Sequence, residues 1–360
     1  MIDHVIIMAG GAGTRLWPSS KNNRPKQFMK IGGEDSLIIS TIKRAFALNH
    51  KGYVIIVTHI NHLKPALEEC SALSVDMRKR IVILPEPYAR NTAPALTLAA
   101  RWLTWKGEAD SSVIVLAADH IINETEHFIE SVESATELAA RDRLVPFGIP
   151  PLTAETGYGY IEAGDPYNPG YNVISFKEKP DLKTAIKFLA AGNYFWNSGM
   201  FVYKTSLFLS ELEKYTPEVA LPFKEIRFKE DHFDRNENIE YLKITDAIKP
   251  IYSEMIKISI DYALMEKSDK IAMIEATFDW NDVGSWDVIS EIDKSPKDIT
   301  AIESHNNFVY GDEMQVTLCG VSDLIIVIEK GQLMICKKGE SQLVKDAVEK
   351  LKAESRNELL

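Results

Sequence analysis

The sequence is poor in cysteine, has no excess of positive charge and contains no long apolar run. Its three cysteines, Cys70, Cys319 and Cys336, lie far apart and form no Cys-x-x-Cys pair, so we expect reduced structural thiols rather than disulfides or a zinc site. The 41 basic residues are outnumbered by 52 acidic ones, which argues against a nucleic-acid partner. Any phosphate ligand must therefore be bound by locally placed cations.

Signals for secretion or membrane insertion are also missing from the sequence. The first residues, MIDHVIIMAGG, contain no basic segment followed by an apolar stretch of signal-peptide length. No apolar run approaches the roughly 18 residues that a membrane-spanning helix requires. We therefore expect a cytoplasmic protein with no membrane partner.

What the sequence does contain is a regular alternation of short apolar runs and longer amphipathic stretches. Strands that are apolar at every position and are separated by helices are typical of a parallel sheet covered on both faces. We therefore predict an α/β, Rossmann-like, doubly wound domain that binds its ligand at the carboxyl edge of the sheet. The predicted strands cover residues 4–9, 53–58, 80–86 and 112–119, and the predicted helices 36–48, 61–72, 92–106 and 124–141.

The pattern changes in the second half of the chain. Short polar strands and a helix over 181–191 indicate a mixed-sheet insertion at 147–203 that roofs the edge of the first sheet. Residues 205–267 look mostly helical with a break at Pro250, and we interpret the charged run EIRFKEDHFDRNENIEYLK within them as a solvated helix and loop surface.

The last part of the chain is predicted to be a separate β-rich unit. A break at SPKD (295–298) is followed by short strands between Gly or Asp turns and by a charged helix near 341–353. These features predict a catalytic domain over 1–290 and a small domain over 296–360.

The segment GGAGTRLWPSSKNNRPKQF (10–28) has the composition of a phosphate-binding loop. It is neither a dinucleotide fingerprint, which would need a third Gly where Leu16 stands, nor a P-loop, which would need Gly-Lys-Ser/Thr. Its glycines, Gly10, Gly11 and Gly13, allow a tight turn whose N–H groups form a nest for an anion. Arg15 and Lys26 add two cations suited to a polyphosphate. The alternative is a Gly-rich turn with two solvated basic residues.

Two acids in distant segments are candidate metal ligands. Asp119 follows a predicted strand at the ligand edge, and Asp282 lies in WNDVGSW. Hard oxygen ligands near a polyphosphate are what Mg²⁺ prefers. The alternative for Asp119 is a helix N-cap or turn residue. Asp279 and Asp287 flank Asp282 and are interpreted as surface acids, and only the motif context selects the middle one.

Two further segments have residues suited to a sugar phosphate. FKEKP places Glu178 beside Lys179, and these side chains can share a role only if the strand ends there, which Pro180 favours. WNSGM offers the amide of Asn197 for hydroxyls and Gly199 for close approach of a ligand. The alternative is a surface ion pair and a turn amide.

Together these motifs resemble the sugar-nucleotide pyrophosphorylases, specifically the mannose-1-phosphate guanylyltransferases. The resemblance covers nearly the whole chain in order. It rests on GGAGTRLWPSS with RPKQF, EPYARNTAPAL (86–96), LAADH (116–120), TGYGYI (156–161), FKEKP, WNSGMF, FDWNDVGSW (278–286) and DLIIVIEKG (323–331). It implies a GT-A-like nucleotidyltransferase domain and a left-handed β-helix-like tail that mediates dimers in some members.

The resemblance also implies a role for each matching residue. Gly10, Gly11, Gly13 and Thr14 would lie against the nucleotide, with Arg15 at the β- and γ-phosphates and Lys26 at the α-phosphate. Arg90, Asn91 and Thr92 would lie by the guanine. Mg²⁺ would be bound by Asp119 and Asp282, the mannose by Gly159, Glu178 and Asn197, and the sugar phosphate by Lys179.

The expected reaction is the transfer of GMP from GTP to mannose 1-phosphate, giving GDP-mannose and pyrophosphate. The sugar phosphate is already ionised, so it needs no general base, and catalysis consists of positioning and charge neutralisation. Many relatives continue into a cupin-like isomerase domain, and we expect no isomerase activity because the sequence stops at Leu360. Three alternatives stay open: another nucleotide and hexose pair, a glycosyltransferase, which would be expected to show Asp-x-Asp, and a non-catalytic regulatory subunit.

Overall fold

The computed structural model of the chain describes residues 1–11, 13–244, 248–293, 299–311 and 314–360. Its contacts divide it into two compact units. Unit 1 consists of Met1–Gly10 and Thr41–Asn281, and unit 2 of Gly11–Ser40 and Asp282–Leu360. Most of the predicted phosphate loop thus belongs to the same unit as the C-terminal part of the chain. The predicted break at 295–298 lies outside the described ranges, and the predicted domain division stays a prediction.

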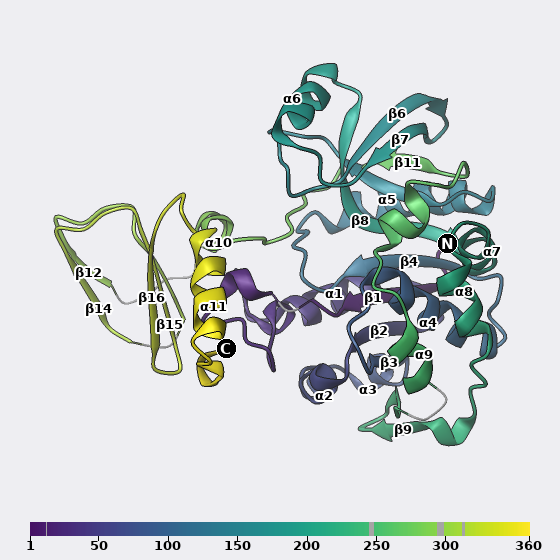
Figure 1. Ribbon diagram of the computed structural model, residues 1–360, viewed down its shortest axis with the longest axis horizontal. Coiled ribbons are helices and arrows are strands. Elements are labelled where there is room, and N and C mark those ends of the chain that lie inside the picture. The colour runs from purple at the N-terminus through teal and green to yellow at the C-terminus, as the bar shows by residue number, and fades with distance from the viewer. Residues whose placement is uncertain (12, 245–247, 294–298, 312–313) are drawn as a thin grey trace. The chain divides into compact units, whose positions relative to one another are not determined.

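Unit 1 is built on one mixed β-sheet. Its strands follow the order β5-β11-β7-β6-β8-β4-β1-β2-β3-β10-β9, of which β8, β4, β1, β2 and β3 can be followed from top to bottom in Figure 1. The strands are β1 (His4–Ala9), β2 (Val54–His59), β3 (Ile81–Glu86), β4 (Ser112–Ala117), β5 (Val145–Ile149), β6 (Tyr160–Tyr167), β7 (Gly170–Lys177), β8 (Tyr194–Lys204), β9 (Phe233–Asn236), β10 (Ile239–Leu242) and β11 (Ala272–Glu275).

The centre of this sheet is parallel, as the apolar runs predict. β1 pairs in parallel with β2 on one side and with β4 on the other, and β2 pairs in parallel with β3. Nearly every residue of these strands is buried, because helices cover them. The predicted doubly wound α/β fold and its mixed sheet are confirmed.

Helices connect these strands and cover the sheet. They are α1 (Leu37–Ala47), which begins in unit 2 and ends in unit 1, η3 (Ile60–His62), α2 (Leu63–Ser71), α3 (Val75–Arg78), α4 (Thr92–Trp105), α5 (Thr125–Ala140), α6 (Leu182–Ala191), α7 (Thr205–Tyr215), α8 (Pro217–Lys224), η4 (Glu230–His232), α9 (Lys249–Glu254) and the π-helix η5 (Asp261–Met265).

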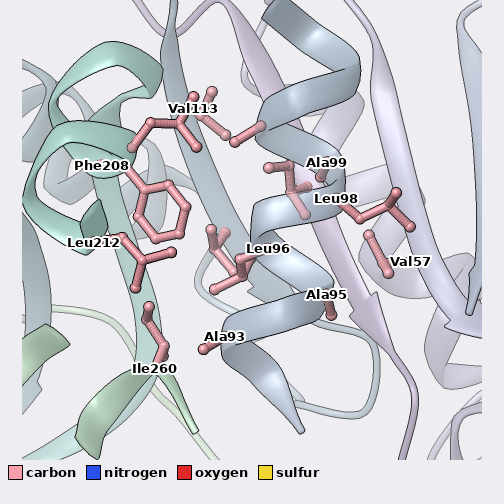
Figure 2. Close-up of a cluster of buried hydrophobic side chains, with 14 of the residues drawn as sticks. Val57, Ala93, Ala95, Leu96, Leu98, Ala99, Val113, Phe208, Leu212 and Ile260 are labelled. Atoms are coloured by element: carbon pink, nitrogen blue, oxygen red, sulfur yellow. The ribbon is translucent and has the colours of Figure 1, made fainter. Parts of the chain in front are cut away.

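Helix α4 lies at the centre of the core of unit 1. Its small and apolar side chains are buried on more than one face, so that Leu96 packs toward Phe208 and Leu212 of α7 while Leu98 packs toward Val57 of β2 (Figure 2). Two-sided burial allows close approach of α4 to the sheet and holds its N-terminus, which follows Asn91, at the carboxyl end of β3.

The insertion differs from its predicted arrangement. β8 pairs antiparallel with β4, β5 and β6, so the inserted strands continue the sheet and do not roof its edge. The reason is that β8 carries a buried apolar run from Met200 to Tyr203, and this run covers what would otherwise be an open edge of β4.

The charged run of residues 225–243 is also not a helix and loop surface alone. It contains the antiparallel hairpin β9–β10, and β10 pairs in parallel with β3. The buried side chains of Phe233, Ile239 and Leu242 stabilise the hairpin, while Asp234, Arg235 and Glu237 are exposed. Pro250 lies in the first turn of α9 and so does not break a helix.

Unit 2 combines the phosphate loop with short strands that pair in the manner of a β-helix. β12–β14 and β13–β15 are parallel, and their partners Ile299–Val316 and Phe308–Ile325 are each 17 residues apart, which is one coil. β15 then pairs antiparallel with β16. The elements are η1 (Thr14–Leu16), η2 (Lys26–Phe28), α10 (Trp286–Ile292), β12 (Ile299–Ile302), β13 (Phe308–Gly311), β14 (Val316–Cys319), β15 (Leu324–Glu329), β16 (Gln332–Lys337), α11 (Leu343–Ala353) and η6 (Asn357–Leu359).

The predicted β-rich unit is confirmed, and its left-handed sense stays a prediction. A small core of Val309, Leu318, Ile326 and Ile328 lies between its strands. No helix in the described part of the chain combines the length and the apolar composition that crossing a membrane requires.

Candidate active site

Gly13 in unit 2 is a position that only glycine can occupy without strain. Its φ is +59°, in the left-handed region, and a Cβ there would lie 2.7 Å from both Lys26 Cβ and Ser20 Oγ. Its carbonyl accepts the hydrogen bond of Leu16 N–H at 3.0 Å, which begins η1. The loop therefore folds tightly enough to bring Arg15 and Lys26, eleven residues apart, to one site.

Lys26 joins the phosphate loop to the segment that contains Asp282. It follows Pro25 at the start of η2 and is only 8% exposed. Its ammonium donates hydrogen bonds to the carbonyl oxygens of Asp282 at 2.6 Å and of Val283 at 3.3 Å. The two motifs PKQF and WNDVGSW, which are far apart in sequence, thus meet within unit 2.

The backbone after Asp282 is held in an unusual conformation. Val283 is β-branched and fully buried, yet its φ is +49°. Such a conformation costs about 1–3 kcal/mol and persists only where surrounding contacts enforce it. It points the carbonyls of Asp282 and Val283 to Lys26. The pattern of the sequence contains no signal for this strain, because Val is normally found in extended backbone.

The carboxylate of Asp282 depends on a second glycine. A Cβ at Gly284 would lie 3.2 Å from both carboxylate oxygens, so a larger residue would displace them. The two flanking acids accept hydrogen bonds from backbone N–H groups. Asp279 accepts hydrogen bonds from Asn123 N–H and Glu124 N–H, at 2.8 Å each, and Asp287 accepts one from Gly339 N–H at 2.6 Å.

A cavity of about 380 Å³ opens in unit 2 between these elements. This volume lies within the roughly 300–1,000 Å³ typical of small-molecule sites. Four predicted site residues line it together, and three of its lining side chains are cations. The lining consists of Gly13, Arg15, Leu16, Lys26, Asp282, Gly284 and Lys345.

At Gly10 and Gly11 of the predicted loop, the protein itself leaves room for a larger side chain. A Cβ at Gly11 would have no atom within 4 Å, and one at Gly10 would lie 3.8 Å from Glu86 Oε2. Close approach of a nucleotide to these two residues stays a prediction. Thr14 begins η1, and its side chain lies outside the described part of the structure.

The residues predicted to bind the mannose gather within unit 1. A Cβ at Gly159 would lie 2.5 Å from Glu178 Oε2, and the carbonyl of Gly159 accepts a hydrogen bond from Asn197 N–H at 2.8 Å. Strand β7 ends at Lys177, so Glu178 is free of strand alternation, as Pro180 predicted. We call Gly159, Glu178, Asn197 and Asp261 the polar cluster.

Asp261 is the member of the polar cluster that the sequence pattern missed. Its Oδ1 accepts a hydrogen bond from Asn197 Nδ2 at 3.0 Å. Burial, together with the charge of nearby Glu178, raises the pKa of Asp261 to about 6. A lone acid after the run IKISI gives no sequence signal, because only the π-helix η5 turns it toward Asn197.

Lys179 and Glu178 form the ion pair that was the alternative interpretation of FKEKP. Lys179 Nζ donates to Glu178 Oε1 at 2.6 Å, and the Glu178 side chain is 9% exposed while that of Lys179 is 61% exposed. An ion pair with one exposed partner can open at low cost, so its presence does not exclude a sugar-phosphate role for Lys179.

The residues predicted near the guanine all have partners in unit 1. Arg90 donates to the carbonyls of Tyr252 at 2.8 Å and Ser253 at 2.7 Å. Asn91, at φ +70°, accepts from Thr92 N–H as the N-cap of α4, and Thr92 Oγ1 accepts from Ile260 N–H. The observed bonds hold the N-terminus of α4 in place, and contact of these residues with a base stays a prediction.

Glu86 is a second residue that the sequence pattern missed. It ends β3 and is 5% exposed, and within the described part of the chain its Oε1 has no hydrogen-bond partner. Burial raises the pKa of Glu86 to about 8, and the neighbouring Tyr252 hydroxyl opposes this shift only in part. A buried carboxyl with an unsatisfied oxygen is costly unless a ligand provides donors. The signal in the sequence was a single acid at the end of an apolar strand.

Asp119 lies at the same edge of the sheet as Gly10. Each follows its strand by one or two residues, and Ala118 N–H donates to Met8 O at 3.0 Å. Asp119 is one-third exposed and lies 4.0 Å from His120 Nε2. Among the described residues, no group of three or more His, Cys, Asp or Glu side chains is placed to hold a metal by itself. Use of one ion by Asp119 of unit 1 and Asp282 of unit 2 stays a prediction.

Comparison with known proteins agrees with this arrangement. A family model described as "Nucleotidyl transferase" matches residues 4–298, and one described as "MannoseP isomerase/GMP-like beta-helix domain" matches residues 297–351. The mannose-1-phosphate guanylyltransferase RfbM of Salmonella typhimurium is 38% identical over 98% of this chain and 73% of its own length. That of Klebsiella pneumoniae is 37% identical over 98% and 74%.

A solved structure extends the similarity to the whole fold. The protein from Thermus thermophilus described as a mannose-1-phosphate geranyltransferase superposes with a TM-score of 0.81 at 26% identity, covering 98% of this chain and all of that one. The chain therefore belongs to the nucleotidyl transferase family, as an enzyme that groups with the mannose-1-phosphate guanylyltransferases.

Proposed function

We propose that the chain transfers GMP from GTP to α-D-mannose 1-phosphate, giving GDP-mannose and pyrophosphate. The observation that supports this most directly is the cavity of unit 2, where Arg15 and Lys26 stand beside the carboxylate of Asp282. Two cations and one hard oxygen ligand in one cavity suit a polyphosphate with its metal. The names of the relatives supply the identity of the sugar and the base.

In the proposed reaction, a phosphate oxygen of mannose 1-phosphate attacks the α-phosphorus of GTP in line. A bond forms between that oxygen and the α-phosphorus, the bond to the β-phosphate oxygen breaks, and pyrophosphate leaves with the electron pair. Lys26 would neutralise charge at the α-phosphate, and Arg15 at the departing pyrophosphate. No proton has to be removed from the nucleophile, so a cavity whose described lining includes no histidine is consistent with the proposal.

We assign the metal ligands to Asp119 and Asp282. Mg²⁺ keeps several waters and is bound by one or two carboxylates plus substrate phosphates, so it needs no larger cluster of acids. The space that Gly284 leaves around the Asp282 carboxylate fits such a ligand. When bound, Mg²⁺ would supply charge neutralisation at the phosphates.

The polar cluster of unit 1 would bind the mannose. Asn197 and Glu178 together offer donors and acceptors for hydroxyl groups, and Gly159 leaves the room that Glu178 occupies. Lys179 would leave its exposed ion pair with Glu178 to bind the sugar phosphate. A neutral sugar is recognised by the geometry of its hydrogen bonds. Side chains that are hydrogen-bonded to each other keep fixed positions and so provide that geometry.

For the base, we propose that Glu86 accepts from the N1–H and N2–H₂ donors of guanine. Burial keeps the free Glu86 carboxyl protonated at neutral pH, and the two donors that guanine presents on one edge would favour its ionised, acceptor-only form, with the proton released to solvent; adenine presents an acceptor there and would not. The unsatisfied Oε1 of Glu86 at the end of β3 is the supporting observation. This chemistry favours GTP over ATP.

The test of the proposed function is a matrix of substrates. The purified protein is incubated with each nucleoside triphosphate and with mannose 1-phosphate or glucose 1-phosphate, and released pyrophosphate is measured. We expect the pair of GTP and mannose 1-phosphate to give the highest kcat/KM. A large preference for UTP or dTTP with glucose 1-phosphate would replace this proposal by another pyrophosphorylase. Turnover with GDP-mannose and a sugar acceptor would favour a glycosyltransferase, and no turnover a regulatory subunit.

We further propose a cytoplasmic homodimer that associates through unit 2. Leu333 and Ile335, two residues apart on β16, and Ile302 of β12 are all more than half exposed, and exposed apolar side chains of this kind are typical of interaction surfaces. Light scattering after size-exclusion chromatography would give the mass in solution. Substituting Leu333 and Ile335 by Asp should convert a dimer to a monomer, and a monomeric wild-type protein would rule this association out.

A further inference from the structure

Helix α11 of unit 2 contributes a side chain to the phosphate cavity. Val344 and Val348 of this helix are buried, and α11 packs against η1, the short helix that contains Arg15. Figure 1 shows α11, in yellow, beside the purple segment that follows β1. Lys345 lies on the exposed side of α11 next to Val344, and it lines the cavity together with Arg15 and Lys26.

The start of α11 is held in a defined position by Asp287. The Asp287 carboxylate accepts hydrogen bonds from Gly339 N–H at 2.6 Å, from Ser341 N–H at 3.2 Å and from Ser341 Oγ at 2.5 Å. Ser341 is 1% exposed and stands just before the helix. Asp287 is therefore not the surface acid that the sequence suggested, since it connects α10 to the turn four residues before Lys345.

Lys345 lies near Glu349, whose pKa it helps to lower, but it forms no close ion pair within the described part of the chain. No carboxylate of the described residues lies within ion-pair distance of its ammonium, whereas Lys352 on the same helix pairs with Glu349 at 2.8 Å. The described lining of the cavity contains three cations and one carboxylate, that of Asp282, and its net positive charge favours a bound anion. The cavity thus has more positive charge than the two cations of the predicted loop explain.

We propose that Lys345 binds the pyrophosphate part of GTP and the pyrophosphate product. This inference rests on the proposed function, and it deepens that function by assigning the β-rich unit a direct part in substrate binding. Lys345 shares the cavity wall with Arg15, the residue assigned to the β- and γ-phosphates. Residues of unit 1 are assigned to the base and the mannose. The pyrophosphate is therefore the part of the substrates that a cation on α11 would bind.

The experiment compares Lys345→Ala with Lys350→Ala, an exposed lysine on the same helix that does not line the cavity. Forward kinetics with GTP and reverse kinetics with pyrophosphate are measured for both variants, with circular dichroism melting as a check on folding. For Lys345→Ala we expect KM for GTP and for pyrophosphate to rise about tenfold, which is the loss of one charge-assisted contact. KM for GDP-mannose and for mannose 1-phosphate should stay within twofold, and Lys345→Arg should restore most of the loss.

A direct binding measurement distinguishes a failure of this inference from a failure of the proposed function. Titration calorimetry of wild type and Lys345→Ala with inorganic pyrophosphate and Mg²⁺ requires no turnover. A weaker affinity of the variant supports Lys345 as a ligand even if the wild-type enzyme makes no GDP-mannose. Equal affinity for pyrophosphate, or an equal rise in KM for GDP-mannose, would overturn the assignment. A matching loss in Lys350→Ala would also overturn it, because the effect would then be one of general charge.

Discussion

The phosphate cavity of unit 2 and the polar cluster of unit 1 hold their side chains in different ways. In the cavity, backbone carbonyls of Asp282 and Val283 hold the ammonium of Lys26. In the polar cluster, side chains hold each other, as Asn197 does with Asp261. We attribute this difference to the ligands, because the cavity would bind charged phosphates and the polar cluster would bind a neutral sugar.

A cation that must bind phosphate has to be positioned without being neutralised. Carbonyl dipoles contribute to this, because they accept hydrogen bonds from the Lys26 ammonium and carry no net negative charge of their own. Sugar hydroxyls carry no net charge and exchange partners with a hydrogen-bonded cluster at little electrostatic cost. Buried acids such as Asp261 are therefore suited to unit 1, where burial raises the pKa of Asp261 to about 6.

The largest effect is expected from removing the positioned cation. Lys26→Ala should reduce kcat by about 10²–10³-fold, since it removes charge stabilisation from the transition state, while KM for mannose 1-phosphate changes little. Steady-state release of pyrophosphate measures both constants. Lys30→Ala, at an exposed lysine of the same unit, is the control. Unchanged turnover in Lys26→Ala would show that Lys26 takes no part in the reaction, and the contrast drawn between the cavity and the polar cluster would then be wrong.

The next largest effect tests how the loop brings its cations together. Gly13→Ala places a Cβ at 2.7 Å from Lys26 and requires a positive φ, so it should lower both the melting temperature and kcat, the latter by about 10–100-fold. Gly11→Ala meets no atom within 4 Å and should leave the melting temperature unchanged. If only a bound nucleotide requires Gly11, its substitution raises KM for GTP alone. Equal melting temperatures for both variants would contradict the role assigned to Gly13.

Glu86→Gln tests the base contact and the buried acid together. Gln offers guanine an amide donor where an acceptor is needed, so kcat/KM for GTP should fall about 10–100-fold with little change for mannose 1-phosphate. A variant that kept its full preference for GTP over ATP would remove Glu86 from base recognition.

The stability of the same variant should depend on pH in a defined direction. The folded chain keeps the Glu86 proton up to a pKa of about 8, while the unfolded chain releases it near the ordinary value of 4.5. This contribution is fully present below pH 4.5 and is lost as pH rises toward 8, by up to about 1.4 kcal/mol per pH unit. Urea unfolding at pH 5, 6.5 and 8 should show Glu86→Gln gaining on wild type as pH rises. A constant difference would contradict the buried, protonated state.

The smallest effect is expected in the polar cluster. Asp261→Asn keeps an acceptor for Asn197 but loses the charge, so KM for mannose 1-phosphate should rise about threefold to tenfold while KM for GTP stays constant. The ratio of wild-type to variant KM should change with a midpoint near pH 6, the pKa of Asp261. Taking the ratio removes the titration of the sugar phosphate itself, whose second pKa is also about 6. A ratio independent of pH would show that Asp261 does not act through its charge.

Much of the fold and part of the candidate site could be predicted from local patterns. The apolar runs predicted the four central strands, because a strand covered on both faces must be apolar throughout. Gly13, Arg15 and Lys26 were predicted from one continuous segment, and the structure brings them together. Glu86 and Lys345 were not predicted, because a lone acid and a lysine on a charged helix look like ordinary surface residues until their surroundings are known.

The sequence by itself determined the alternation of strands and helices over residues 4–141 and the composition of the phosphate loop, since both depend on contacts between near neighbours. Only the tertiary structure decided that β8 continues the sheet beside β4, that Val283 adopts a positive φ against Lys26, and that α11 presents Lys345 to the cavity. Each of these depends on segments far apart in the chain. Packing and hydrogen bonding across the whole fold select these pairings, and the local composition of each segment has little influence on them.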